Sequence, residues 1–269
     1  MSDGVMIKGA IHVHSTYSDG EFTLAELREV YAALGCGFVL MTDHAEDFDA
    51  ARLADYVAEC AQLSDGRFRF VAGLEFNCDR RMHVLGFGVT RRTVATDPQA
   101  VIRHIKDEGG VAVIAHPMDS AFEWIESFDE LPHGIETWNS KYDGRMAPRP
   151  QTFALLNRLQ QREPRMRAFY GQDLHWKRQH RGLLNCLQVK GAEREAVLSA
   201  FERGDYFAMK DDAELPSSGK LSAELLARFG SENRRYAQRR QLIKRAKKLI
   251  DRVGLRVPAP VKAQLRRIF

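Results

Sequence analysis

The feature that most constrains this chain is a regular alternation of short apolar runs with longer amphipathic stretches, from Met6 to about Lys210. Apolar runs of strand length lie at 6–14, 38–44, 68–76, 82–89, 111–117, 134–139, 166–175 and 184–191. Apolar residues at helical spacing predict helices over 23–35, 49–63, 97–110, 150–161 and 193–204. Repeated strand-then-helix order favours an α/β fold on a parallel sheet, either wound into a barrel or doubly wound.

Side chains that can bind metal ions stand at the carboxyl ends of nearly all these runs. They are His12, His14, Asp43, His44, Glu75, His116, Glu136, Asp173 and His175, whereas His83 begins its run. The carboxyl ends of the strands in a β/α barrel converge on one face, so these side chains are expected to meet there. His12 and His14 are alternate residues of a predicted strand and could share one cation. His104 and His133 lie outside this pattern.

Composition limits the class of protein. A chain of 269 residues suffices for one large α/β domain or two small ones. Its 4 cysteines are widely spaced without a CxxC pair, which argues against a thiolate zinc site and a disulfide framework. The amino-terminal residues lack a leader pattern and no apolar run reaches membrane-spanning length. We therefore expect a cytoplasmic protein.

Charge divides the chain into two parts. Residues 220–269 contain 15 Lys and Arg against 3 Asp and Glu, which leaves 25 against 33 in residues 1–219. The segment 211–220 is rich in polar and turn-forming residues and marks a boundary. We expect a catalytic domain over 1–212 and a basic amphipathic helical tail over 220–269.

The tail has three interpretations. Its apolar residues at helical spacing are Leu242, Ala246, Leu249, Ile250 and Val253. This apolar face could dock on the catalytic domain, which we favour by a modest margin, or lie on an anionic membrane as a peripheral contact. Nucleic-acid binding is the third interpretation. This interpretation is weakened because the tail after Phe229 contains few aromatic residues, namely Tyr236 and Phe269.

Six short motifs in order resemble the PHP (polymerase and histidinol phosphatase) superfamily. They are "HVHSTYSDG", "TDH", "GLE", "MHVLG", "AHP" and "DLH", and they cover roughly residues 6–210. The resemblance implies a distorted seven-stranded β/α barrel of the PHP type, here followed by a basic C-terminal helical appendage. It also implies two or three divalent metal ions at the carboxyl ends of the strands, because characterised members are mostly metal-dependent phosphoesterases.

Carried over motif by motif, the resemblance implies three sets of ligands. The first metal would be bound by His12, His14, Glu75 and Asp173. Glu75 would bridge to a second metal held by His83 and His116, and the third would take Asp19, His44 and His175. Some members have histidine in place of Asp19, and a carboxylate there favours Mn²⁺ or Fe²⁺ without excluding Zn²⁺.

Further residues near the same strand ends are candidates for catalysis and substrate binding. Asp43 and Glu136 are the candidate catalytic carboxylates, although Asp43 could instead orient a ligand and Glu136 could cap a helix. The candidate substrate contacts are Asn139, Arg145, Lys177, Arg178 and His180, most of them cationic groups that could hold a phosphate. Trp124, Trp138 and Trp176 could stack on a base or sugar, although packing around the rim is the more common use of such residues.

The sequence therefore predicts a metal-dependent phosphoesterase that hydrolyses a small phosphomonoester with a hydroxide held between metal ions. One alternative is a 5′–3′ exonuclease or a nucleotide bisphosphate phosphatase. An alternative from another class is a non-catalytic, metal-stabilised binding module. The complete set of candidate ligands argues against this last alternative.

Overall fold

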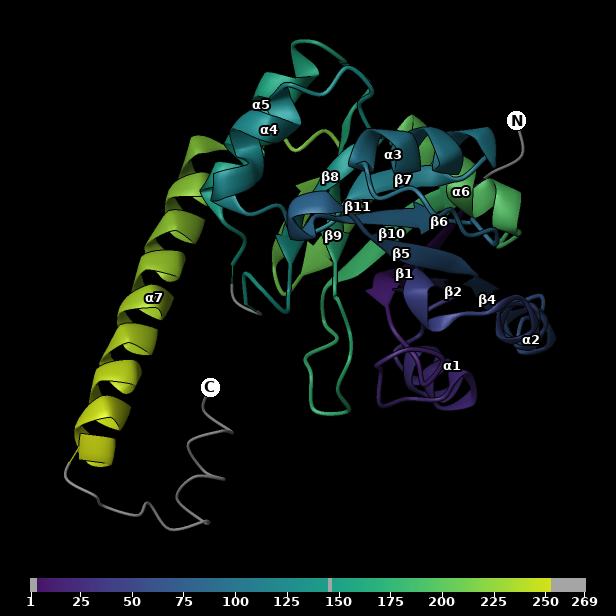
Figure 1. Cartoon of the computed structure of the whole chain (residues 1–269), viewed down its shortest axis with the longest axis horizontal. Coiled ribbons are helices and arrows are strands. Elements are labelled where there is room, and N and C mark those ends of the chain that lie inside the picture. The colour runs from purple at the N-terminus through teal and green to yellow at the C-terminus, as the bar shows by residue number, and fades with distance from the viewer. Residues whose placement is uncertain (1–3, 145–146, 253–269) are drawn as a thin grey trace.

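The structure, a computed structural model, describes residues 4–144 and 147–252. Its strands form two six-stranded sheets (Figure 1). The first sheet has the order β12 (Ala213–Pro216), β11 (Tyr206–Lys210), β10 (Leu184–Val189), β1 (Val5–Val13), β2 (Phe38–Met41), β4 (Arg69–Val71). The second has the order β3 (Asp43–His44), β5 (Gly73–Asn77), β6 (His83–Phe87), β7 (Val111–Ile114), β8 (Gly134–Asn139), β9 (Arg167–Gly171).

Both sheets are mixed, which corrects the expectation of a parallel sheet. β1, β2 and β4 are parallel, as are β7, β8 and β9, but β6 is antiparallel to both of its neighbours. The reason is local, because a tight return over Asp79–Arg81 joins β5 to β6 where a helical crossover would be needed for parallel pairing. The α/β class is correct, and the seven-stranded count is not confirmed.

The two sheets meet beside the candidate ligands. β3 follows β2 after Thr42, so this segment passes from one sheet into the other. On the other side, the segment after β9 runs along the end of β1. Gln172 N donates to Ile11 O at 3.0 Å, Leu174 N to His12 O at 3.1 Å, and His14 N to Leu174 O at 3.0 Å. The residues after β1 and β9 are therefore held against each other.

Helices form where the sequence predicted them, and the short helix α4 was not predicted. They are α1 (Leu24–Ala33), α2 (Ala50–Gln62), α3 (Pro98–Asp107), α4 (Phe122–Glu126), α5 (Pro150–Gln160), α6 (Arg194–Arg203) and α7 (Ala223–Arg252). Thr23 caps α1 through a reciprocal capping box with Glu26, and Gly35 follows its end with a φ of 71°. No helix among the described residues is long and apolar enough to span a bilayer.

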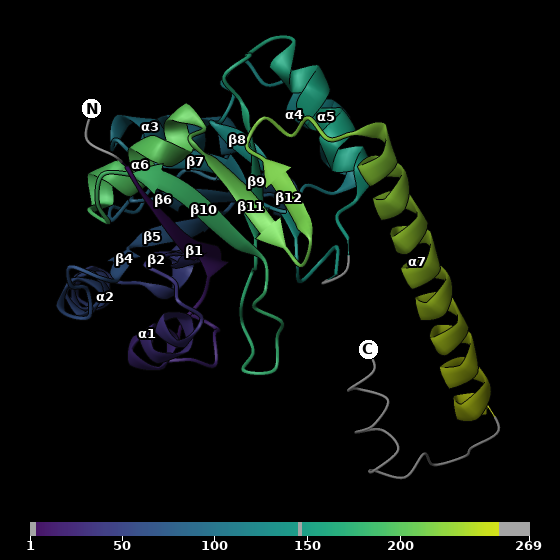
Figure 2. The same ribbon diagram turned by 180° about the vertical axis from the view of Figure 1, so that it is seen from behind.

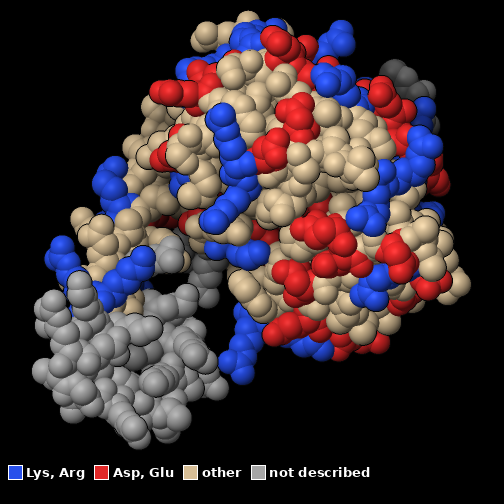
Figure 3. All heavy atoms as spheres, in the orientation of Figure 1, with Lys and Arg blue, Asp and Glu red and all other residues tan. Residues whose placement is uncertain are grey.

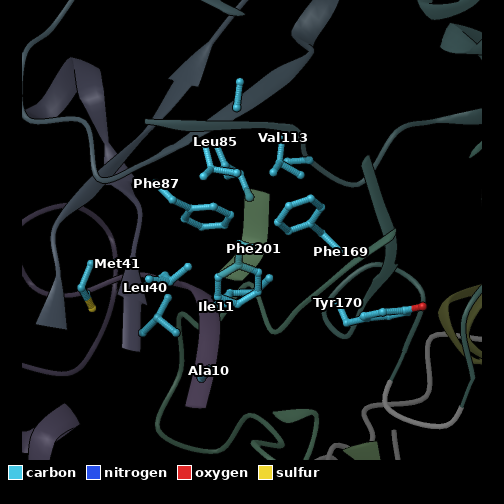
Figure 4. Close-up of a cluster of buried hydrophobic side chains, with 14 of the residues drawn as sticks. Ala10, Ile11, Leu40, Met41, Leu85, Phe87, Val113, Phe169, Tyr170 and Phe201 are labelled. Carbon is cyan, nitrogen blue, oxygen red and sulfur yellow. The ribbon is translucent and has the colours of Figure 1, made fainter. Parts of the chain in front are cut away.

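The core lies between the sheets and under α6. Figure 4 shows Phe87 and Phe169 from the second sheet facing Phe201 of α6. The ring centroids of Phe169 and Phe201 are 5.8 Å apart, and all three rings are buried. Ile11 and Leu40 fill the same space from the first sheet. This packing fixes the strands whose ends carry the candidate ligands.

Helix α7 packs on the body at its amino-terminal end and then runs away from the sheets (Figures 1 and 2). Phe229 is 1% exposed, with its ring centroid 5.8 Å from that of Trp138. Asn233 donates from Nδ2 to the carbonyl oxygens of Ala147 and Pro148. Leu242, on the predicted apolar face, is 64% exposed. The chain after 252, including Val253 of the predicted apolar face, lies outside the described residues.

Candidate metal centre

The nine predicted metal ligands come together in one cluster. Its members are His12, His14, Asp19, His44, Glu75, His83, His116, Asp173 and His175. A nitrogen of each imidazole lies within 4.0 Å of a carboxylate oxygen of the cluster, and each carboxylate has at least one such imidazole neighbour. They lie in or near strands of both sheets, at the junction described above. His104 and His133 are not part of it: their ring nitrogens bond to the backbone of Arg91 and Ala112.

Glu75, which is buried on β5, lies at the centre of the cluster. Its Oε2 is 3.4 Å from His12 Nε2, 3.2 Å from His14 Nε2 and 3.5 Å from His44 Nδ1. Its Oε1 is 2.7 Å from His83 Nδ1 and 3.4 Å from His116 Nε2. One carboxylate therefore faces five imidazoles from four different segments. The tight return between β5 and β6 is what brings His83 to this rim.

Backbone geometry at three of these residues is unusual. His12, His116 and Asp173 have φ values of 60°, 27° and 49°, in the left-handed region that non-glycine residues rarely adopt. The strain shows that the surrounding structure holds these side chains in place. At His12 the pairing of β1 with β2 shifts register, so the predicted regular alternation of His12 and His14 is wrong in detail. Both imidazoles nevertheless face Glu75.

Close approach around the cluster also requires a glycine. A Cβ atom on Gly171 would lie 1.7 Å from Glu136 Oε1 and 3.0 Å from the Cβ of His12. No side chain can occupy that space. The end of β9 can therefore approach His12 and Glu136 this closely only because residue 171 is glycine.

The donor set fits bound divalent cations. Three groups of ligand atoms each lie within 4.8 Å of one another: His14, Asp19, His44 and His175; His12, Glu75 and His116; and His12, His14 and Asp173. Both ring nitrogens of His14 and Nδ1 of His44 are buried without a hydrogen-bond partner, although Glu75 is near. Unpaired buried nitrogens are costly unless a cation uses their lone pairs. Imidazole and carboxylate are ligands that suit manganese, iron and zinc.

The charge states of His14 and of the three carboxyl groups point the same way. Burial lowers the pKa of His14 to about 3, so this imidazole is neutral and free to bind a metal at pH 7. Burial acts to raise the pKa of Asp19, but hydrogen bonding to His175 and the nearby imidazoles outweigh it and bring the pKa to about 2. The pKa values of Glu75 and Asp173 also lie well below their usual range, since their histidine neighbours outweigh burial. All three carboxyl groups are therefore ionised.

Two buried residues orient the cluster. Glu136 Oε1 is 2.8 Å from His12 Nδ1, and its Oε2 accepts from the backbone N of His116 at 2.8 Å. Asn139 donates from Nδ2 to Glu136 at 2.9 Å and to Asp173 at 3.1 Å. These contacts direct Nε2 of His12 toward Glu75. They make Glu136 and Asn139 positioning residues, so the catalytic role predicted for Glu136 and the substrate contact predicted for Asn139 stay predictions.

Asp43 holds the loop that contains Asp19. Its side chain accepts from Ser15 N at 2.8 Å and from the hydroxyls of Ser15 and Ser18 at 3.1 Å and 2.7 Å. Asp43 is fully buried and burial raises its pKa, with the bonds from Ser18 and Ser15 opposing that rise. Its oxygens thus face the 15–18 turn, which supports the orienting interpretation rather than a direct catalytic role.

The predicted substrate contacts are more dispersed. Lys177 pairs through Nζ with Glu26 on α1. Lys177, Arg178 and His180 all line a cavity next to the cluster. Arg145 lies outside the described residues.

Lys141 was not predicted from the sequence, yet it reaches the cluster. Its Nζ is 3.1 Å from Asp173 Oδ1 and 3.2 Å from His175 Nε2, and its side chain is 20% exposed. Tyr142 and Trp176 flank it, with ring centroids 5.3 Å and 5.6 Å from Nζ. The only signal in the sequence was a lysine two residues after Asn139 at a strand end.

Replacing Glu136 by glutamine should weaken metal binding by about 10- to 100-fold, the usual cost of losing a partner that orients a ligand. The amide keeps the size of the side chain but removes the charge that holds the Nδ1 proton of His12. Competition with a metal chelator measures the affinity. The matched control is Glu123→Gln, an exposed position on α4. Equal affinity of Glu136→Gln and the parent would contradict the orienting role.

Comparison with known proteins gives related folds at low sequence identity. The structure superposes with a TM-score of 0.52 on a two-domain protein from Bacteroides vulgatus described as containing a predicted PHP-like metal-dependent phosphoesterase, at 15% identity over 87% of this chain and 71% of that chain. It superposes on PsfC from Pseudomonas syringae with a TM-score of 0.50, at 14% identity over 87% of this chain and 98% of that one. No family model matches.

One curated protein matches part of the sequence. The DNA polymerase/3′-5′ exonuclease PolX of Bacillus subtilis is 34% identical over 79 residues, which are 26% of this chain and 14% of PolX. The match thus spans a small part of that protein. The fold is thus similar to that of a protein described as PHP-like, in line with the resemblance that the six motifs indicated.

Proposed function

We propose that this chain is a metal-dependent phosphoesterase whose active site is the cluster around Glu75. The observation that carries the proposal is the buried carboxylate surrounded by five imidazoles, several of whose nitrogens lack any other partner. The PHP-like fold supports the same conclusion. Bound divalent ions would supply a water of lowered pKa and neutralise charge on the phosphate.

The ligands can be divided among the ions in a way that differs slightly from the motif-based expectation. Asp19, His44 and His175 would hold one ion, with His14 added because its ring lies in the same group. His12 and His116 would share a second ion with Glu75. Asp173 would bind an ion together with His12 and His14. His83 is hydrogen-bonded to Glu75 and completes the set at the rim.

The chain's own residues would bind and orient the ester. Asp19 is 53% exposed, whereas Glu75 and His12 are buried, so the phosphate would enter from the side of Asp19 and Lys141. The ammonium of Lys141 would contact a phosphate oxygen there. In the hydrolysis the water oxygen bonds to phosphorus, the ester P–O bond breaks and the leaving oxygen takes a proton. Tyr142 and Trp176 would shield this mouth.

The proposal is tested by supplying Mn²⁺, Fe²⁺ or Zn²⁺ to metal-stripped protein and measuring release of p-nitrophenol from p-nitrophenyl phosphate. We expect turnover with at least one metal, and loss of turnover in His14→Ala but not in His104→Ala. A chain that binds metal but hydrolyses neither this ester, nor nucleotide bisphosphates, nor phosphorylated oligonucleotides would instead be the non-catalytic module.

A second candidate within the same chemistry is an exonuclease or a nucleotide bisphosphate phosphatase. It is favoured by the cavity of about 1570 Å³ that adjoins Lys141, because pockets for small ligands have roughly 300–1,000 Å³. Loss of nucleotides from the ends of phosphorylated oligonucleotides would distinguish an exonuclease from a phosphatase that releases only inorganic phosphate.

A further inference from the structure

Lys141 places a positive charge against the ligands of the candidate metal centre. Its Nζ is 3.1 Å from Asp173 Oδ1, and it lies 3.2 Å and 3.3 Å from the two ring nitrogens of His175. Both of these residues belong to groups whose atoms could hold an ion. The ammonium of Lys141 therefore borders two of the positions at which a divalent ion could bind.

Asp173 Oδ1 is the atom that the ammonium and an ion would share. It is 3.7 Å from His12 Nε2 and 3.9 Å from His14 Nε2, the other two members of its group. The second oxygen of Asp173, Oδ2, accepts from Asn139 Nδ2 at 3.1 Å. Asp173 is 1% exposed, so water screens charge little there and two cations on one oxygen repel each other. Binding of an ion with His12 and His14 therefore competes with the Lys141 contact.

The backbone of Lys141 is fixed, whereas its side chain reaches the mouth of the centre. The backbone N atoms of Lys141 and Tyr142 both donate to Asn139 Oδ1 at 3.1 Å, which holds the turn after β8. The side chain of Lys141 is 20% exposed and passes between Tyr142 and Trp176, which are both about half exposed. A change of rotamer is therefore enough to turn the ammonium from Asp173 toward an anion at the mouth.

The rest of the body attracts cations, so the position of Lys141 opposes the general charge. Residues 1–219 contain 33 Asp and Glu against 25 Lys and Arg. Figure 3 shows many acidic side chains gathered at the lower right of the view, over the part of the body where α1 and α2 lie. Such a surface raises the local concentration of divalent ions. The lysine at the ligands is what would keep one ion weakly bound.

We propose that Lys141 competes with the ion that Asp173, His12 and His14 would hold, and that a phosphate group removes this competition. The proposal rests on the proposed function, because it concerns the ions and the phosphate of that site. A phosphate oxygen that accepts from the ammonium of Lys141 leaves Asp173 Oδ1 free for the ion. By linkage, the anion then raises the affinity for the ion, and the ion raises the affinity for the anion by the same factor.

Two other roles for Lys141 give effects of a different sign. If its ion pair holds Asp173 in the left-handed conformation, with a φ of 49°, removal of the charge would weaken ion binding. If Lys141 only contacts phosphate, removal of the charge would leave ion binding unchanged in the absence of an anion. Competition alone predicts tighter ion binding when the charge is removed.

The test measures Mn²⁺ binding to the metal-stripped, full-length chain from the electron paramagnetic resonance signal of free Mn²⁺. Titrations are made with and without methylphosphonate, a phosphate mimic whose P–C bond is not hydrolysed. A titration without protein corrects for Mn²⁺ bound by the anion. We expect methylphosphonate to raise the affinity of the most weakly bound ion by about tenfold or more in the parent, within the usual range of coupling between two ligands.

Lys141→Met removes the charge and keeps an unbranched side chain that can pack between Tyr142 and Trp176. Without an anion, this variant should bind the weakest ion about tenfold more tightly than the parent, and its coupling to methylphosphonate should be smaller by the same factor. Direct contact between the anion and the ions adds coupling in both proteins, so the two coupling factors are compared. The matched control is Lys190→Met, an exposed lysine after β10, which should behave as the parent does.

Lys141→Gln provides a second neutral variant if Lys141→Met does not fold, as judged by circular dichroism. Anion-free affinity equal to or weaker than that of the parent, or an unchanged coupling factor, would overturn the proposal. The same preparations are assayed with p-nitrophenyl phosphate. If the parent binds Mn²⁺ and hydrolyses this ester while the variants show no such change, only the competition by Lys141 is wrong. If the parent binds no divalent ion, the proposed function fails and this inference fails with it.

Discussion

Glu75→Gln should lower kcat/KM for any phosphoester substrate by about a thousandfold, the upper range for removing one charge-stabilising group. Glu75 is buried and its two oxygens face five imidazoles, so no other described carboxylate can replace it at the centre of the cluster. The glutamine keeps the volume of the side chain but has one neutral oxygen and one NH₂ group, which repels cations. Steady-state kinetics with saturating Mn²⁺ measures the effect.

The matched control for this variant is Glu29→Gln, an exposed carboxylate on α1 that should leave kcat/KM unchanged. Metal content measured on the same samples tells whether the loss comes from a missing ion. If Glu75→Gln kept activity within tenfold of the parent, the catalytic site would have to lie elsewhere on the chain.

Metal binding should stabilise the fold strongly. A ligand at about a hundred times its dissociation constant adds about 2.7 kcal/mol to the free energy of unfolding, which corresponds to roughly 5–10 °C in Tm for a chain of this size. The physical reason is that ions bind the folded cluster, where the ionised Glu75, Asp173 and Asp19 lie close together, and not the unfolded chain. Differential scanning calorimetry with and without Mn²⁺ measures the shift.

The shift should disappear when a chelator is added, and it should shrink in Glu75→Gln. A sodium salt at equal ionic strength is the control for general screening of charge. An identical Tm with and without every divalent metal tried would show that the folded cluster does not bind cations, and would remove the basis of the proposed function.

Much of the fold could be predicted from local patterns. Helix α1 lies within the predicted range 23–35, and Gly35 follows its end in the left-handed conformation. Strand direction could not be predicted, because β6 is antiparallel for a reason that lies in the short return before it. The direction in which two strands pair depends on the geometry of the connection between them. The period of the hydrophobic pattern indicates only that a segment is a strand.

The candidate ligands were predicted because histidine and carboxylate at so many strand ends are chemically unusual together. Lys141 was missed, since nothing in the sequence distinguishes a lysine that reaches Asp173 from one on the surface. The predicted roles of Asp43 and Glu136 show the same limit. Their contacts with Ser15 and His12 depend on which way each buried side chain points.

The order of the residues by itself determined most of the strands and helices, apart from α4, β11 and β12, and which side chains could bind metal, because both follow from residue type and local spacing. Only the tertiary structure decided that His12 of β1 faces both Glu75 of β5 and Asp173 after β9. It also decided that Tyr236 of α7 faces the same cavity as Trp176. Such contacts join residues far apart in the chain, and long-range packing rather than local preference selects them.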